Sequence, residues 1–283
     1  MQYPQRVVNG SLGLLLLGGL CGVTGCNKLK ARDLLNQGIE AYKVAQFDQS
    51  EEDFKQAAEL DPKLINARVY LATAYASQYV PGGPTPENVR HGQQAIIEFN
   101  KVLEQDPSNL SALDGIGSVL YQMASNPFDA AKLEDSKQYH EKHIQIRPGD
   151  PQPYYWVAVI DWTLAHHANS DLRHNFNDSL ATAKRRRPAK PLGEEDPLPQ
   201  NLRQQFATRY GQIVDEGITE CKKAIDINPD YADAMAYLNL LDRQKADMVE
   251  SASEREDLLK QANALVDKVK EIKEREAAAS KSS

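Results

Sequence analysis

Apolar and polar positions alternate at helical spacing between residues 31 and 62, the stretch ARDLLNQGIEAYKVAQFDQSEEDFKQAAELDP. Two apolar stripes at i, i+3 and i+4 spacing predict two amphipathic helices in this stretch. The stripes consist of Leu34, Gly38 and Ala41 in the first helix and Ser50, Phe54 and Ala57 in the second. Small residues allow paired helices to approach closely, and aromatic residues interlock between them. Because one pair cannot bury both stripes, the pattern predicts a stack of such pairs.

The same pattern returns along the chain, stretched by insertions. The predicted repeats span residues 31–64, 65–109, 110–150, 151–231 and 232–276. Proline, glycine and charged residues concentrate in predicted insertions at 80–90, 125–135 and 168–200. We therefore expect an all-α helical solenoid of about five helix pairs with long inter-helix insertions, followed by a disordered tail at 277–283.

Small, aromatic and proline residues recur at fixed places of the first repeat: Gly38, Tyr42, Ala45, Phe47, Ser50, Phe54, Ala57 and Pro62. In these positions the repeat resembles the tetratricopeptide repeat (TPR), a helix–turn–helix unit of about 34 residues. The resemblance implies a groove, lined by the first helix of each repeat, that binds peptides of partner proteins. By register, the implied groove residues are Tyr42, Lys43, Asn66, Thr73, Ser77, Tyr121, Gln122, Tyr155, Trp162 and Arg243. Tyrosine, tryptophan and arginine are enriched at binding hot spots, although a tyrosine at this repeat position also serves packing.

The N-terminal 25 residues have the pattern of a targeting segment. Arg6 is followed by the apolar run SLGLLLLGGLCGV, which is too short and too glycine-rich for a secure membrane span. The residues before Cys26 resemble a bacterial lipobox, which implies that 1–25 is a lipoprotein signal peptide, that Cys26 is lipidated and that 26–30 is a short linker. Asn27 after the cysteine implies the outer membrane, with the protein facing the periplasm. An ordinary secretory signal or a membrane anchor with an incidental cysteine is the alternative.

Charge restricts the choice of partners. The formal net charge of -7 argues against general nucleic-acid binding, which needs basic residues to neutralise phosphates. A local basic run, Lys184, Arg185, Arg186 and Arg187, could contact anionic lipid headgroups or an acidic partner. The favoured interpretation is a solvated loop, which the acidic residues at 194–196 could neutralise in cis. Cys221 falls on a packing position and is expected to be a buried small hydrophobe.

Histidines are the remaining candidates for chemistry. His140 and His143 lie three residues apart on a predicted helix and could share a metal, as could a cluster of His166, His167 and His174. The first two occupy packing positions of their repeat, however, and adjacent histidines diverge on a helix. We therefore expect no metal and no cofactor. The sequence also contains no phosphate-binding glycine loop or nucleophile elbow, so no enzyme activity is expected.

These features together predict a lipid-anchored periplasmic TPR scaffold or adaptor. Its expected partner is another envelope protein or peptide, bound in the groove during assembly of an outer-membrane, secretion or pilus complex. Two alternatives stay open: a periplasmic protein that binds a metal or small ligand, and a cell-wall enzyme without a recognisable motif. The oligomeric state stays open as well.

Overall fold

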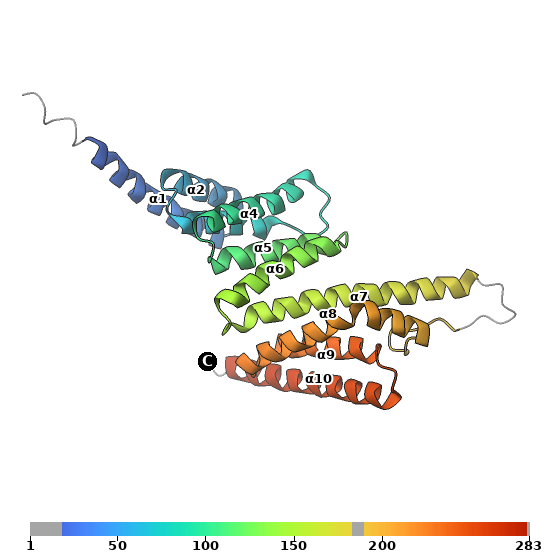
Figure 1. Ribbon diagram of the computed structural model, residues 1–283. Helices are drawn as coiled ribbons and strands as arrows, with labels where there is room; N and C mark the ends of the chain where they lie inside the picture. The colour runs from blue at the N-terminus through green and yellow to red at the C-terminus, as the bar shows by residue number, and fades with distance from the viewer. Residues whose placement is uncertain (1–18, 183–189, 282–283) are drawn as a thin grey trace, which may run out of the picture. The chain divides into compact units, whose positions relative to one another are not determined.

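The computed structural model describes residues 19–182 and 190–281, and the regular secondary structure in these ranges is helical (Figure 1). The helices are α1 (Gly19–Lys43), α2 (Phe47–Leu60), α3 (Ile65–Gln78), α4 (Pro86–Gln105), α5 (Leu110–Ser125), α6 (Ala130–Ile146), α7 (Pro151–Thr182), α8 (Gln200–Ile227), α9 (Ala232–Ala246) and α10 (Ala252–Lys281). Consecutive helices pair, and one pair corresponds to each predicted repeat.

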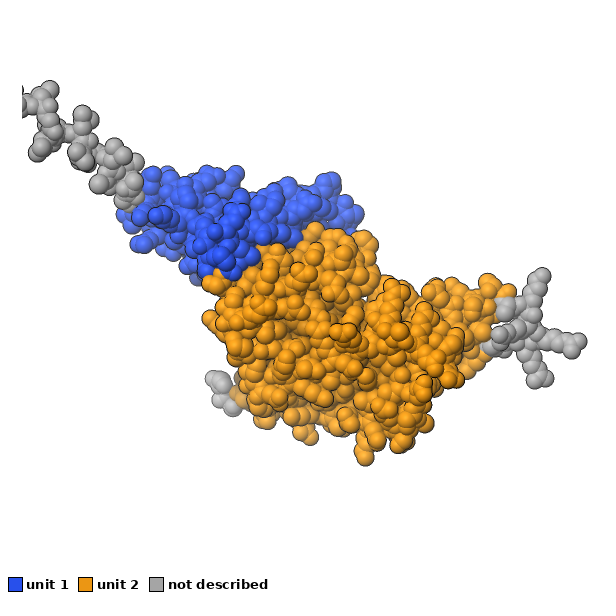
Figure 2. Space-filling view, in the orientation of Figure 1, with its two compact units in different colours: residues 1–107 blue, residues 108–283 orange. Residues whose placement is uncertain are grey.

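The chain divides into two compact units at Pro107, between the second and third predicted repeats (Figure 2). Unit 1, residues 1–107, stacks the pair α1–α2 on α3–α4. Unit 2, residues 108–283, stacks α5–α6, α7–α8 and α9–α10, and α7 also contacts α9. The continuous solenoid expected from sequence thus consists of two units, each with its own core.

Close helix approach in unit 1 depends on Gly38. A Cβ atom added there would lie 2.6 Å from the ring of Phe54, which is fully buried. Phe99 of the second pair is 3% exposed. The predicted combination of a small residue and an aromatic residue therefore forms the packing contact, at the density that protein interiors require.

The core of unit 2 lies where α7, α8 and α9 meet. Its buried members are Ala158, Ala165, Leu198, Phe206, Val214, Cys221, Leu238, Leu241 and Met248. Cys221 is fully buried, as its packing position predicted, and burial raises the pKa of its thiol. This thiol is therefore an inert core group.

Two helices begin earlier than the sequence predicted. α4 begins at Pro86, inside the predicted insertion at 80–90, because proline suits the first helical turn and the Thr85 side chain caps the helix by accepting from the Asn88 backbone N–H. α6 begins at Ala130, inside the predicted insertion at 125–135. The Asp129 side chain accepts hydrogen bonds from the backbone N–H groups of Ala131 and Lys132. Asp129 is therefore the N-cap residue directly before the start of this helix.

Other predicted irregular segments are also helical. Residues 26–30, expected to be a linker, continue α1, and residues 277–281, expected to be disordered, continue α10 through an alanine run of high helix propensity. Residues 168–182 extend α7, where Leu172 packs against the core. In α10, Ile272 is buried, whereas Val266 is 48% exposed. No helix in the described part of the chain has the length and apolar character to cross a bilayer.

Candidate functional site

Six rings form a continuous row in unit 2, here called the aromatic row. In spatial order they are Tyr121 of α5, Trp156 and Tyr155 of α7, Tyr237 of α9, and Trp162 and His166 of α7. The centroids of neighbouring rings lie between 4.7 and 5.6 Å apart. Aromatic pairs at this separation attract each other. The row therefore extends over the first helices of three consecutive pairs.

Local sequence explains how α7 supplies most of the row. Tyr155, Trp162 and His166 are separated by seven and four residues, so they lie on one face of the helix. All the rings remain partly accessible: His166 is exposed, and the other five are half-buried. Side chains that pack on one side and face solvent on the other are available to a partner.

The row carries little charge near neutral pH. Burial raises the pKa values of the Tyr155 and Tyr237 hydroxyls, which keeps both in the neutral form. Burial also lowers the pKa of His166, although the nearby Glu194 opposes this shift. His166 is therefore a neutral ring that stacks on Trp162, with an interplanar angle of 11°.

A cavity of about 650 Å³ lies at the Trp162 end of the row. Its walls come from α7, from residues 192–195, from α9 and from the beginning of α10. Trp162 and His166 form an aromatic wall, and Leu240 and Leu259 add apolar surface. Ligand pockets in proteins have volumes of about 300–1,000 Å³ and a largely apolar lining with a few polar groups. The volume of this cavity lies in that range, whereas most of its lining residues are polar or charged.

Arg173 holds three of these elements together. Its Nε donates to Asn169 Oδ1 at 2.9 Å, and one terminal nitrogen donates to Asp247 Oδ2 at 2.6 Å. The other terminal nitrogen donates to the carbonyls of Gly193 (2.6 Å) and Asp196 (2.9 Å). Arg173 is 8% exposed, and its charge is balanced by Asp247. Buried charges are found where they are paired and hydrogen-bonded in this way.

Further contacts fix the same segment, residues 190–199. The Asn177 side chain donates to the Leu192 carbonyl at 3.0 Å and accepts from the Leu192 amide at 2.7 Å. Leu198 is 1% exposed and belongs to the core, and Arg255 donates to the Glu195 carbonyl at 2.9 Å. The segment is irregular, as expected for an insertion. It is nevertheless held in place by these hydrogen bonds, and it forms one wall of the cavity.

Of the predicted groove residues in unit 1, Tyr42 and Ser77 contact each other through their side chains. The Tyr42 hydroxyl lies 2.6 Å from Ser77 Oγ, which also donates to the Thr73 carbonyl. Lys43 pairs with Glu40 on its own helix. Asn66 is exposed at the beginning of α3.

In unit 2 the structure brings Tyr121, Tyr155 and Trp162 into the aromatic row. Gln122 is half-buried beside Tyr121 in sequence. Arg243 lines the cavity and donates to Asn239 and Asn263.

Sequence reasoning missed Trp156 and Tyr237. With repeats beginning at residues 151 and 232, Trp156 and Tyr237 stand at the same register place, one position after that of Tyr155. An aromatic residue recurring at one register place was the available signal. The basic run Lys184 to Arg187 lies outside the described residues.

Two of the histidines share a carboxylate, because Asp114 Oδ1 lies 3.5 Å from His140 Nδ1 and is also in contact with His143, whereas His167 and His174 have other partners. His140 is fully buried and stacks on Trp156, while His143 Nδ1 lies 2.8 Å from Asp114 Oδ1. His167 stacks on Phe128, and His174 pairs with Asp178. Within 19–182 and 190–281, no group of three or more histidine, cysteine, aspartate or glutamate residues is arranged to hold a metal ion.

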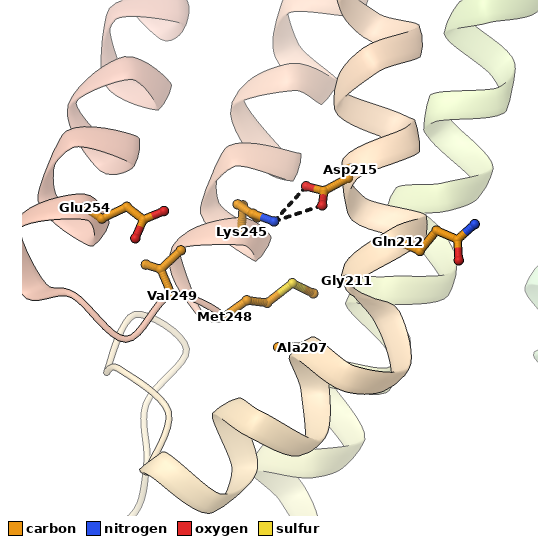
Figure 3. A pocket seen from close by; sticks show the side chains of 8 residues that line it. All are labelled: Ala207, Gly211, Gln212, Asp215, Lys245, Met248, Val249 and Glu254. Carbon is orange, nitrogen blue, oxygen red and sulfur yellow. Dashed lines mark hydrogen bonds and ion pairs between the residues drawn. The ribbon is translucent and has the colours of Figure 1, made fainter.

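A second cavity of about 530 Å³ opens between α8, α9 and the beginning of α10 (Figure 3). Lys245 crosses it to pair with Asp215 at 2.7 Å, and its other lining side chains include no aromatic ring. Two of its three charged lining groups thus already bind each other, and it lacks an aromatic surface, which makes it a weaker candidate than the cavity beside Trp162.

No protein-family model matches this chain, and no curated protein matches its sequence. Solved structures are similar in fold. A MamA protein shares 13% identity over 88% of this chain and 94% of its own, with a TM-score of 0.53. MamA from Desulfovibrio magneticus RS-1 (41 to the end) shares 16% over 87% and 96%, with a TM-score of 0.53. YrrB, described as a TPR protein with an unusual peptide-binding site, shares 13% over 87% and 92%, with a TM-score of 0.50.

At these identities the likeness concerns the fold. The chain is an all-α, TPR-type helical solenoid, and the fold class predicted from its sequence is confirmed.

Proposed function

We propose that this protein is a non-catalytic scaffold that binds a segment of a partner protein along the aromatic row of unit 2. One observation carries the proposal: six partly accessible rings from three helices form an unbroken surface. Tyrosine and tryptophan contribute large contact areas at small entropic cost and dominate binding hot spots. The TPR-type fold supports this reading, since YrrB of similar fold is described as having a peptide-binding site.

The proposal includes the cellular setting. Cys26 carries a lipid, and the protein is anchored in the bacterial envelope, in the outer membrane facing the periplasm. The partner is another envelope protein, bound during assembly of an outer-membrane, secretion or pilus complex. The lipobox-like residues before Cys26 support this setting, and Cys26 is exposed in the folded chain.

Alanine variants of the row test the proposal. Tyr237→Ala and Tyr121→Ala should each weaken capture of the partner from an envelope extract by about 2 kcal/mol, or roughly 30-fold, as expected for hot-spot residues. Tyr139→Ala, on α6 outside the row, is the matched control and should bind as the wild type does. Circular dichroism melts check that every variant is folded. Unchanged capture by a folded Tyr121→Ala, Tyr237→Ala double variant would contradict the proposal.

A further inference from the structure

The cavity beside Trp162 has a preformed aromatic wall. Trp162 and His166 stack with their centroids 4.7 Å apart, and Tyr237 meets Trp162 edge-on at 5.4 Å. Because burial lowers the pKa of His166, the imidazole is neutral and acts as a stacking surface. A planar ring entering the cavity would extend this stack through offset or edge contacts.

The charges around the cavity balance one another. Arg173 is neutralised by Asp247. The remaining charged groups of the lining include Arg243 and Arg255 on one side and the exposed Glu194 and Glu195 on the other. Two positive and two negative groups in one lining give no strong preference for an anionic or a cationic ligand. Within this mostly polar lining, the surface that an aromatic group can contact consists of Trp162, His166, Leu192, Leu240 and Leu259.

The cavity exists because side-chain hydrogen bonds hold residues 190–199 in a fixed position. Leu192, Glu194 and Glu195 supply one wall, and Arg173 and Asn177 hold that wall through its backbone. A wall fixed before binding reduces the entropy that a ligand must remove. The insertion thus builds a site that the helix pairs alone lack.

We propose that this cavity holds one aromatic side chain of the partner segment that lies along the aromatic row. The inference rests on the proposed function, because it names the anchor residue of that partner. Buried aromatic anchors that fill a pocket are the usual energetic centre of an interface. The cavity lies at the end of the row, so a single extended segment reaches both.

The chain offers a direct probe, because Trp156 and Trp162 are its only tryptophans. In the ¹⁵N-labelled full chain, the indole N–H signal of Trp162 reports on the cavity, and that of Trp156 reports on the part of the row next to Tyr121. Titration with N-acetyl-tyrosinamide should shift the Trp162 signal and leave the Trp156 signal in place. N-acetyl-leucinamide should bind about 2- to 10-fold more weakly, the factor that ring–ring contacts add.

Two variants test the role of the cavity itself. Ser170→Phe, at an exposed position of the lining, should fill the space and abolish the shift without affecting folding. Arg173→Ala should release the wall and also abolish the shift, whereas Lys190→Ala, an exposed change in the same segment, should preserve it.

Three results would overturn the inference: no shift at Trp162, an equal shift with the leucine probe, or stronger binding of N-acetyl-argininamide. If any of these occurs while Tyr121→Ala and Tyr237→Ala still lose the partner, the anchor assignment fails and the proposed function stands. If the probe binds as expected and those row variants keep the partner, the proposed function fails instead.

Discussion

Gly117 shows how one residue determines the packing of a helix pair. A Cβ atom added at Gly117 of α5 would lie 2.6 Å from Nε2 of His140, whose ring is fully buried on α6 and stacks on Trp156. The ring has no free space to move into, so the two helices approach this closely only with glycine at this place.

Gly117→Ala should therefore destabilise unit 2 by about 1–3 kcal/mol, the usual effect of overpacking. Gly211→Ala is the matched control, since it also lies within a helix but has open space around it. That change should stabilise by up to about 1 kcal/mol through helix propensity. Urea unfolding measures both, and equal effects of the two substitutions would contradict the packing account.

Asp242 makes stability depend on pH. The side chain is 6% exposed, and burial raises the pKa of its carboxyl to about 6 from its ordinary 3.8. The folded state therefore holds this proton more tightly than the unfolded state. The contribution of this carboxyl to the free energy of unfolding is therefore greatest below pH 3.8. It decreases as the pH rises from 3.8 to about 6.

Asp242→Asn should remove this contribution. Between pH 5 and pH 7, the free energy of unfolding should fall by about 1 kcal/mol less in the variant than in the wild type. Asp226→Asn, an exposed change on α8, should keep the wild-type pH dependence. A steeper fall in Asp242→Asn than in wild type would show that the sign is wrong.

At the scale of elements, the amide side chain of Asn177 holds the segment 190–199 in the way that a neighbouring backbone would. Asn177 makes two hydrogen bonds with Leu192, one as donor and one as acceptor. Each such bond contributes about 1 kcal/mol, and removing both should allow the segment to open more often.

Asn177→Ala should accelerate hydrogen exchange of the Leu192 amide by about tenfold or more. Asn175→Ala, an exposed change on the same helix, should leave that exchange rate unchanged. The comparison uses exchange measured by mass spectrometry on peptides that contain Leu192. Equal exchange in the wild type and Asn177→Ala would mean that these bonds do not hold the segment.

The helix pairs were predictable because their signals are local. Gly38 and Phe54 stand within one repeat, and their spacing alone indicated close packing. Signals for two helix starts, Thr85 before Pro86 and Asp129 before Ala130, were present in the sequence and went unused. These are errors of interpretation at insertion boundaries.

The cavity was not predictable from the same kind of signal. Arg173 meets Asp247 across 74 positions of sequence and meets Gly193 through its carbonyl oxygen, which any residue provides. No pattern of residue types encodes a bond to a backbone atom of a distant insertion. For the aromatic row, Trp162 and Tyr121 followed from the repeat register, whereas the recurrence of an aromatic residue at the register place of Trp156 and Tyr237 went unused. Only the contact between α7 and α9 shows that Tyr237 meets Tyr155 and Trp162.

At the scale of the whole molecule, the proposed lipid on Cys26 determines where both units act. Cys26→Ser should abolish incorporation of radiolabelled palmitate and release the protein from the membrane fraction. Cys21→Ser is the matched control, because Leu20 before Cys21 is too bulky for a lipobox cleavage site, and it should stay labelled. Palmitate label retained by Cys26→Ser would contradict lipidation at this residue.

The central claim is that unit 2 binds its partner through the aromatic row, and site-specific photocrosslinking in living cells tests it most directly. A photoreactive phenylalanine analogue replaces Tyr121, Tyr237 or, as the control on α6, Tyr139. We expect positions 121 and 237 to give a cross-linked product with the same envelope protein, and position 139 to give none. A product from position 139 together with none from the two row positions would contradict the account.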